Sequence, residues 1–168
     1  LGRTAQAVAC DGADLSDGRS MLSVERLVAV LHAAGSGDKG LLLWLDTRKL
    51  DWLHLPKAFG AWCLHADVAA VPLDARVLFS SVGSGLGNVG QASYASSNAW
   101  LDAHALSERA GGSAALALQW PLVGGAGMGA AAFDATGQRM AAIAGLASIA
   151  LEEYAMCLNR QLVLKAGV

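Results

Sequence analysis

Residues 76–109 read RVLFSSVGSGLGNVGQASYASSNAWLDAHALSER, and this stretch decides the class of fold. Its opening run, Arg76–Ser81, is short, apolar and bounded by turn residues, which predicts a buried β-strand. The segment Gly83–Gly90 is rich in glycine and predicts a loop. Ala92–Arg109 then predicts a helix, which the following pair of glycines ends. A strand, a loop and a helix in this order are typical of an α/β protein with a parallel sheet.

The same alternation extends to both sides of this stretch. The further strands that we expect are Ala5–Cys10, Leu27–Ala34 and Ala114–Trp120, and the further helices are Ser20–Ala29, Leu50–Val68 and Leu151–Leu162. Asp46 or Thr47 is expected to cap the helix over 50–68, and Pro56 to kink it or divide it. The pattern predicts a Rossmann-like, doubly wound parallel sheet. Because such a sheet usually has about six strands, we expect this one to be incomplete at its N-terminus.

The composition excludes several classes of function. The 168 residues are 54% apolar and 15% charged, which suits strands buried on both faces of a sheet. No apolar stretch approaches the roughly 20 residues of a membrane span, so we expect no membrane partner. The net charge is −2, without a basic stripe, so we expect no nucleic-acid partner.

The cysteines are few and far apart. Cys10, Cys63 and Cys157 form neither a disulfide framework nor a pair with metal-ligand spacing. We expect them to be small buried hydrophobic residues in a reducing compartment. The cytoplasm is the expected location, with an organelle left open.

One motif invites a different interpretation. Gly85–Gly90 matches the G-x-G-x-x-G pattern of dinucleotide-binding loops and lies between a predicted strand and a predicted helix. That mechanism also requires an acidic residue near the end of the next strand, to hold the ribose. The next strand ends at Leu118-Gln119-Trp120, without a carboxylate. We therefore interpret this segment as a loop on the substrate side.

Four polar residues are expected near one edge of the sheet. Ser81 ends a strand, and Lys57 lies on the helix before that strand. Tyr94 and Asn98 share one face of the next helix, because they are one turn apart. Active sites of open α/β sheets gather at the carboxyl ends of the strands, where this group is predicted to meet.

This group of side chains suits the reduction of a carbonyl. A hydride that reaches the carbonyl carbon leaves negative charge on the oxygen, which must be stabilised and protonated. A phenol has an ordinary pKa of about 10, and a neighbouring ammonium group lowers that pKa by favouring the phenolate. We expect Tyr94 to donate the proton, with Lys57 beside it. We expect Ser81 to hold the carbonyl oxygen and Asn98 to position the lysine or a relay water.

Each residue alone also has an ordinary structural explanation. A tyrosine in an amphipathic helix usually belongs to the core, a single lysine is usually solvated, and two serines after a strand usually form a turn. Only their joint placement favours the functional interpretation.

The segments Val77–Ser81 and Gly87–Ala103 resemble the core of polyketide-synthase ketoreductase domains, which belong to the short-chain dehydrogenase/reductase superfamily. In that family the order Lys, Ser, Tyr, Asn is typical, with the lysine on the earlier helix. The four residues named above keep this order, and Pro56–Trp62 resembles the family's lysine helix. The resemblance extends from about Val8 to Leu162.

The resemblance implies a function and a cofactor. It implies NADPH-dependent reduction of a β-ketoacyl group on an acyl carrier protein to a β-hydroxyacyl group, in polyketide or fatty acid synthesis, with neighbouring synthase domains as partners and no metal. The residues that it places along the cofactor are Asp11, Ala33, Ala34, Gly35, Ser80, Tyr94, Lys57, Pro121 and Leu122. The family's glycine-rich phosphate loop would precede Leu1. Residues 1–168 are therefore expected to be the catalytic and substrate-side part of the domain, which alone binds cofactor weakly.

Other interpretations stay open at this point. A non-catalytic structural remnant within a megasynthase is favoured by the absence of the phosphate loop and disfavoured by the intact set of four side chains. A fatty-acid synthase ketoreductase has a similar pattern. A free-standing short-chain dehydrogenase is disfavoured, because those enzymes usually carry Tyr-x-x-x-Lys and this chain has Asn98 in place of that lysine.

Overall fold

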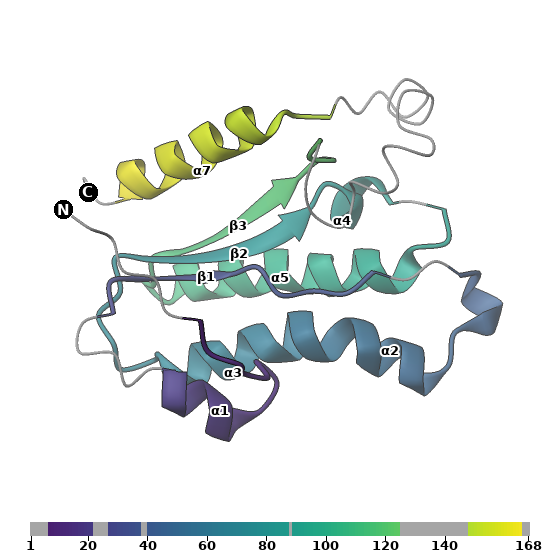
Figure 1. The fold of residues 1–168 in the computed structure, drawn as a ribbon, viewed down its shortest axis with the longest axis horizontal. Coiled ribbons are helices and arrows are strands. Elements are labelled where there is room, and N and C mark those ends of the chain that lie inside the picture. The colour runs from purple at the N-terminus through teal and green to yellow at the C-terminus, as the bar shows by residue number, and fades with distance from the viewer. Residues whose placement is uncertain (1–6, 22–26, 38–39, 88, 125–147, 166–168) are drawn as a thin grey trace.

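A parallel sheet organises the part of the chain that the computed structural model describes, residues 7–21, 27–37, 40–87, 89–124 and 148–165 (Figure 1). Within these ranges the sheet has three strands in the order β1 (Ala29–His32), β2 (Ala75–Ser81) and β3 (Ala115–Trp120). Both neighbouring pairs are parallel, with His32 beside Leu78 and Ser81 beside Trp120. The carboxyl ends of the strands therefore meet at one edge of the sheet.

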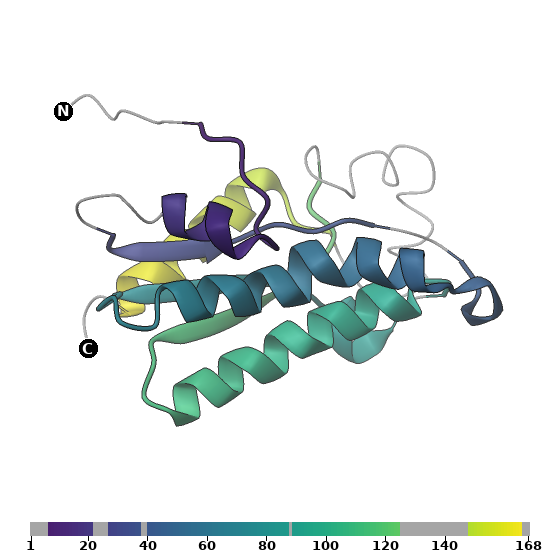
Figure 2. The ribbon, with the colours of Figure 1, turned by 90° about the horizontal axis from the view of Figure 1, so that it is seen from below.

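Helices cover both faces of this sheet (Figures 1 and 2). On one face lie α5 (Ala92–Ala110) and a continuous rod made of α2 (Thr47–His54), the π-helical segment η2 (Leu55–Phe59) and α3 (Gly60–Asp67). On the other face lies α7 (Leu151–Lys165). The short elements are α1 (Leu15–Met21), the 3-10 turn η1 (Leu42–Trp44) and α4 (Gly83–Leu86). The predicted doubly wound α/β architecture is confirmed.

The core lies between the sheet and the helices α3 and α5. Its buried members are Ala61, Leu78, Leu101, Ala105 and Ala115. Alternate residues of β2 point to the opposite face, where the ring of Tyr154 on α7 lies 6.3 Å from that of Phe79 and 4.4 Å from that of Trp120. Both faces of β2 are covered, which explains its apolar sequence.

The rod of α2, η2 and α3 follows the predicted pattern. Asp46 is its N-cap, and the Asp46 carboxylate accepts a hydrogen bond of 2.8 Å from the backbone of Lys49. Pro56 was expected to kink or divide this helix, because a proline has no N–H to donate. The chain accommodates it by widening into the five-residue π-helical segment η2.

Three sequence expectations for local structure are wrong. The described part of the expected strand Ala5–Cys10, residues 7–10, is irregular, because no neighbouring strand pairs with it in the described chain. The expected helix Ser20–Ala29 is wrong at its C-terminal end, where Ala29 belongs to β1. Ser20 and Met21 belong to α1, and residues 22–26 lie outside the described ranges. The expected loop Gly83–Gly90 contains the short helix α4.

The start of α1 had a signal in the sequence. The Asp14 carboxylate accepts hydrogen bonds from the backbone and the hydroxyl of Ser16, at 2.8 and 2.6 Å, and Asp17 lies in the first turn. An aspartate cap followed by an acidic first turn is a typical helix start. The position of this cap therefore determines where α1 begins, and the apolar residues that follow in the sequence do not.

Two expectations from composition can be compared with the structure. None of the helices in the described ranges combines the length and the apolar character of a membrane span. All three cysteines are free. Cys63 is buried as expected, but Cys10 is only partly buried and Cys157 is exposed on α7, so the prediction of buried cysteines is wrong for these two.

Candidate active site

The structure brings Lys57 and Tyr94 together. Lys57 is 3% exposed, and its ammonium group lies 5.5 Å from the centroid of the Tyr94 ring. The same group donates a hydrogen bond of 3.1 Å to the carbonyl of Phe79 on β2. The π-helical segment that carries Lys57 is held to the end of β1 by a contact of 2.9 Å between His32 Nε2 and the Lys57 carbonyl. Contacts with β1 and β2 therefore hold Lys57 in place beside Tyr94.

Burial changes the acidity of this lysine. It lowers the pKa of Lys57 from 10.5 to about 8, and the negative charge of Asp102 opposes part of that shift. Burial also lowers the pKa of His32, which keeps this histidine neutral at neutral pH. Lys57 is thus a buried cation that loses its proton just above neutrality.

The predicted serine lies at the carboxyl end of β2. Ser81 is half-buried, and its hydroxyl accepts a hydrogen bond of 3.2 Å from the backbone of Gly83. Its neighbour Ser80 points to the other face, where its hydroxyl donates to the Asn98 carbonyl at 3.3 Å. The two serines therefore have different surroundings, with Ser80 holding α5 to the sheet.

Asn98 is fully buried below Tyr94. Its amide nitrogen donates a hydrogen bond of 2.8 Å to the Tyr94 carbonyl. Its Oδ1 atom has no hydrogen-bond partner in the described part of the chain. A buried carbonyl oxygen of this kind is ordinarily satisfied, often by water. That oxygen is the atom of Asn98 that suits a relay water.

A second polar group, which the sequence analysis did not find, lies beside this one. Asp102 Oδ2 accepts hydrogen bonds from the Ser84 hydroxyl at 2.6 Å and from the Gln119 amide at 2.7 Å. These contacts join α5, α4 and β3, and they hold the carboxylate that opposes the pKa shift of Lys57. Asp102 follows Asn98 by one helical turn, and this spacing was the only signal in the sequence.

Most of the residues expected to contact a cofactor lie near the edge of the sheet where the carboxyl ends of the strands meet. Ala33, Ala34 and Gly35 follow β1 directly and are exposed, and Pro121 and Leu122 follow β3. Parallel pairing brings these segments to the edge where β2 ends in Ser80 and Ser81. Small, exposed residues at such an edge fit a flat dinucleotide, which can approach the backbone closely.

Asp11 directly follows the expected strand Ala5–Cys10. It lies in the turn before α1, where its carboxylate accepts a hydrogen bond of 2.9 Å from the backbone of Ala13. The described residues before it form no strand, and its contact with a cofactor stays a prediction.

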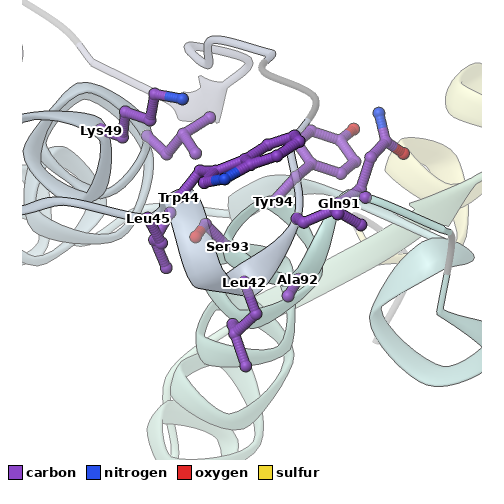
Figure 3. Close-up of a pocket in the computed structure, with 12 residues that line it drawn as sticks. Leu42, Trp44, Leu45, Lys49, Gln91, Ala92, Ser93 and Tyr94 are labelled. Atoms are coloured by element: carbon purple, nitrogen blue, oxygen red, sulfur yellow. The ribbon is translucent and has the colours of Figure 1, made fainter.

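A pocket opens beside Tyr94 (Figure 3). One wall comes from the segment around η1 and the opposite wall from the start of α5. The lining residues include Leu41, Trp44, Leu45, Leu53, Gln91 and Tyr94. The glycine-rich segment interpreted above as a substrate-side loop contributes Gly90 to this pocket.

A cluster of titratable residues lies between α3 and α5. The possible ligand atoms of His65, His104 and Glu108 lie within 4.8 Å of one another. The Arg76 guanidinium, however, lies 2.8 Å from His65 Nδ1 and 3.0 Å from a Glu108 oxygen. A fixed positive charge already occupies this position, so the cluster acts as an ion-pair connection between β2 and the two helices.

Comparison with known proteins gives consistent matches. The family model of the KR domain matches residues 1–125. A protein of the spectinabilin polyketide synthase system of Streptomyces orinoci is 42% identical over 88% of this chain. A 6-methylsalicylic acid synthase of Aspergillus niger is 43% identical over 66% of it. The chain spans only 7% and 6% of the lengths of these two relatives.

Solved structures agree with the sequence matches. An A-type ketoreductase from a modular polyketide synthase superposes with a TM-score of 0.85 at 32% identity, over 94% of this chain and 34% of that one. The first ketoreductase of the tylosin synthase gives a TM-score of 0.79 at 35% identity, over 89% of this chain and 32% of that one. A short-chain dehydrogenase/reductase from Vibrio parahaemolyticus, at 17% identity and a TM-score of 0.63 over 71% of this chain and 59% of that one, shares the fold.

Proposed function

Because this chain belongs to the KR domain family of polyketide synthases, we propose that it reduces a β-ketoacyl thioester to the β-hydroxyacyl thioester with NADPH. The proposed substrate is carried on an acyl carrier protein. KR domains are oxidoreductases of the short-chain dehydrogenase type, and their fold implies a nicotinamide cofactor. The choice of NADPH, the carrier-bound substrate and the roles of individual residues are parts of the proposal. So is the assignment of residues 1–168 to the catalytic and substrate-side part of the domain.

One observation carries the proposal. A buried ammonium group, that of Lys57, lies over the ring of Tyr94 at the carboxyl edge of a parallel sheet. Burying the charge of a lysine costs folding free energy unless the charge is paired or hydrogen-bonded. Buried charged groups of this kind are common in active sites. A nearby cation favours the phenolate that a tyrosine becomes after it has donated its proton.

The roles of the side chains follow from this geometry. When bound, a nicotinamide cofactor would supply the hydride that reduces the carbonyl carbon. Ser81, half-buried at the carboxyl end of β2, donates a hydrogen bond to the carbonyl oxygen as negative charge develops there. Tyr94 gives its phenolic proton to that oxygen, and the Lys57 ammonium stabilises the phenolate that is left. The Asn98 Oδ1 atom holds a water that returns a proton to the site.

The residues at the edge of the sheet are suited to hold the nicotinamide cofactor. Ala33, Ala34 and Gly35 offer exposed backbone with minimal side chains, and Pro121 and Leu122 lie beyond β3 on the same edge. We propose that these segments contact the cofactor. We also propose that the protein acts in the cytoplasm beside the other domains of a synthase, in keeping with its three free cysteines.

The replacement of Tyr94 by phenylalanine tests the proposal. In the full-length protein, Tyr94→Phe should lower kcat for the reduction of acetoacetyl-pantetheine by about 100-fold or more, because the proton donor is lost. Tyr154→Phe is the matched control, since Tyr154 is the other tyrosine of the chain and lies on α7. Oxidation of NADPH and of NADH is followed by absorbance, and thermal denaturation checks the fold.

The outcomes separate the possibilities. Loss of turnover in Tyr94→Phe with retention in Tyr154→Phe supports the proton-donor role. Retention of more than about a few per cent of turnover in Tyr94→Phe would contradict that role. No reduction of any β-ketoacyl thioester by the native protein would contradict the proposed function and favour the non-catalytic remnant.

A further inference from the structure

The pocket beside Tyr94 has an unusual wall. Large apolar side chains form it although they remain open to solvent, with Trp44 68% exposed and Leu41 51% exposed. Leu53, which is 2% exposed, is a further apolar lining residue. Burying such side chains stabilises a folded chain, so a tryptophan left exposed beside a reactive group indicates a surface that a ligand covers.

The backbone holds this wall in place against the start of α5. The amide of Gly40 donates a hydrogen bond of 2.8 Å to the carbonyl of Gly90, which connects the segment before η1 to the segment before Tyr94. Gly90 has φ of 73°, and a Cβ atom there would lie 3.5 Å from the Gly40 backbone. Trp44 follows Gly40 closely along the chain, so the link positions the indole over the pocket that Tyr94 also lines (Figure 3).

We propose that Trp44 is a specificity-determining residue that binds the hydrocarbon chain of the acyl substrate and makes kcat/KM increase with the length of that chain. The inference rests on the proposed function, because it places the reacting carbonyl at Tyr94. From there the pocket between η1 and the start of α5 leads along Leu41, Leu45 and Trp44. The lining is mostly apolar, and Lys49 is its one charged side chain, so the pocket suits a hydrocarbon chain. Each added CH₂ group then gains contact with the indole and the leucines.

A chain-length series tests the inference. The native protein, Trp44→Ala, Trp44→Phe and Trp52→Ala are compared with NADPH and 3-oxoacyl-pantetheine thioesters of increasing length. We expect kcat/KM of the native protein to rise by up to about fourfold per added CH₂, which corresponds to about 0.8 kcal/mol. Trp44→Ala should flatten this dependence, chiefly through KM, and Trp44→Phe should keep most of it.

Trp52→Ala is the matched control. Trp52 is 66% exposed, nearly as much as Trp44, but it lies on α2 and does not line the pocket. An unchanged chain-length dependence in Trp52→Ala together with a flat one in Trp44→Ala supports the inference. A dependence in Trp44→Ala as steep as in the native protein would overturn it and leave the proposed function intact. A native protein that reduces none of the thioesters would overturn both.

Discussion

At the scale of single residues, the acidity of Lys57 is a property on which the proposed mechanism depends. Its ammonium group has little access to water and lies against a phenol and a backbone carbonyl. Burial brings its pKa down to about 8, and Asp102 opposes that shift. The proposed mechanism needs the protonated form, so the pH at which Lys57 loses its proton limits the reaction.

This limit predicts a pH profile. For reduction, kcat/KM of the native protein should fall as the pH rises through about 8, the pKa of Lys57. Asp102→Asn removes the negative charge that raises this pKa, so the fall should begin at a lower pH. Glu108→Gln is the control, because Glu108 lies on the same helix and its carboxylate pairs with Arg76. This variant should leave the pH at which kcat/KM falls unchanged. A profile unmoved in Asp102→Asn would contradict the electrostatic role of Asp102.

The same pKa shift also affects stability. The folded-state pKa of Lys57 lies below the ordinary value of 10.5, so between about pH 8 and pH 10.5 the unfolded chain binds more protons than the folded chain. The free energy of unfolding therefore gains from this residue as the pH rises through that window. At neutral pH the buried charge of Lys57 therefore lowers the free energy of unfolding.

At the scale of elements, the connection between the segment before η1 and the segment before α5 depends on Gly90. Its φ of 73° lies in the left-handed region, which a residue with a Cβ atom enters at a cost of about 1–2 kcal/mol. Gly90→Ala should lower the free energy of unfolding by about that amount, and it should raise KM because the wall that carries Trp44 shifts away from Tyr94.

A second glycine gives the matched control for that change. Gly85 lies on α4, and a Cβ atom there would meet nothing within 4 Å. Gly85→Ala should leave both KM and the denaturation midpoint close to those of the native protein. Equal effects of the two substitutions would show that the backbone conformation at Gly90 does not hold the wall.

The elements that the sequence predicted well are those whose signals are local. The strand over Arg76–Ser81 needed only its apolar run, and the N-cap at Asp46 needed only its own side chain. The strand expected at Ala5–Cys10 failed because a strand requires a partner, which no local pattern reveals. The turn η1 was not expected at all, because its conformation accompanies a hydrogen bond between Gly40 and Gly90, which lie far apart in the sequence.

The candidate site also has features that the sequence predicts and features that it does not. The resemblance to a known family predicts that Lys57, Ser81, Tyr94 and Asn98 lie together, and the structure places Lys57 over Tyr94. The contacts of Asp102 with Ser84 and Gln119 join three separate elements, so only the folded chain reveals them.

At the scale of the whole molecule, the edge that carries the candidate active site and the hydrophobic core depend on the same helix. Leu101 is fully buried in the core on α5, and Asn98 and Tyr94 lie on earlier turns of that helix. Leu78 in the same core lies on β2, the strand that ends in Ser80 and Ser81. The positions of the reactive side chains are therefore set by how firmly α5 packs on the sheet.

This dependence gives a prediction for the molecule as a whole. Leu101→Ala should lower the free energy of unfolding by about 2–5 kcal/mol, because it leaves a cavity that the core does not fill. Leu106→Ala is the matched control on the same helix, since Leu106 is 62% exposed. Urea denaturation measures both. A domain is typically stable by only about 5–15 kcal/mol, so the core variant should also lose ketoreductase activity at temperatures where the control keeps it. Equal losses of stability in the two variants would mean that α5 does not pack on the sheet through Leu101.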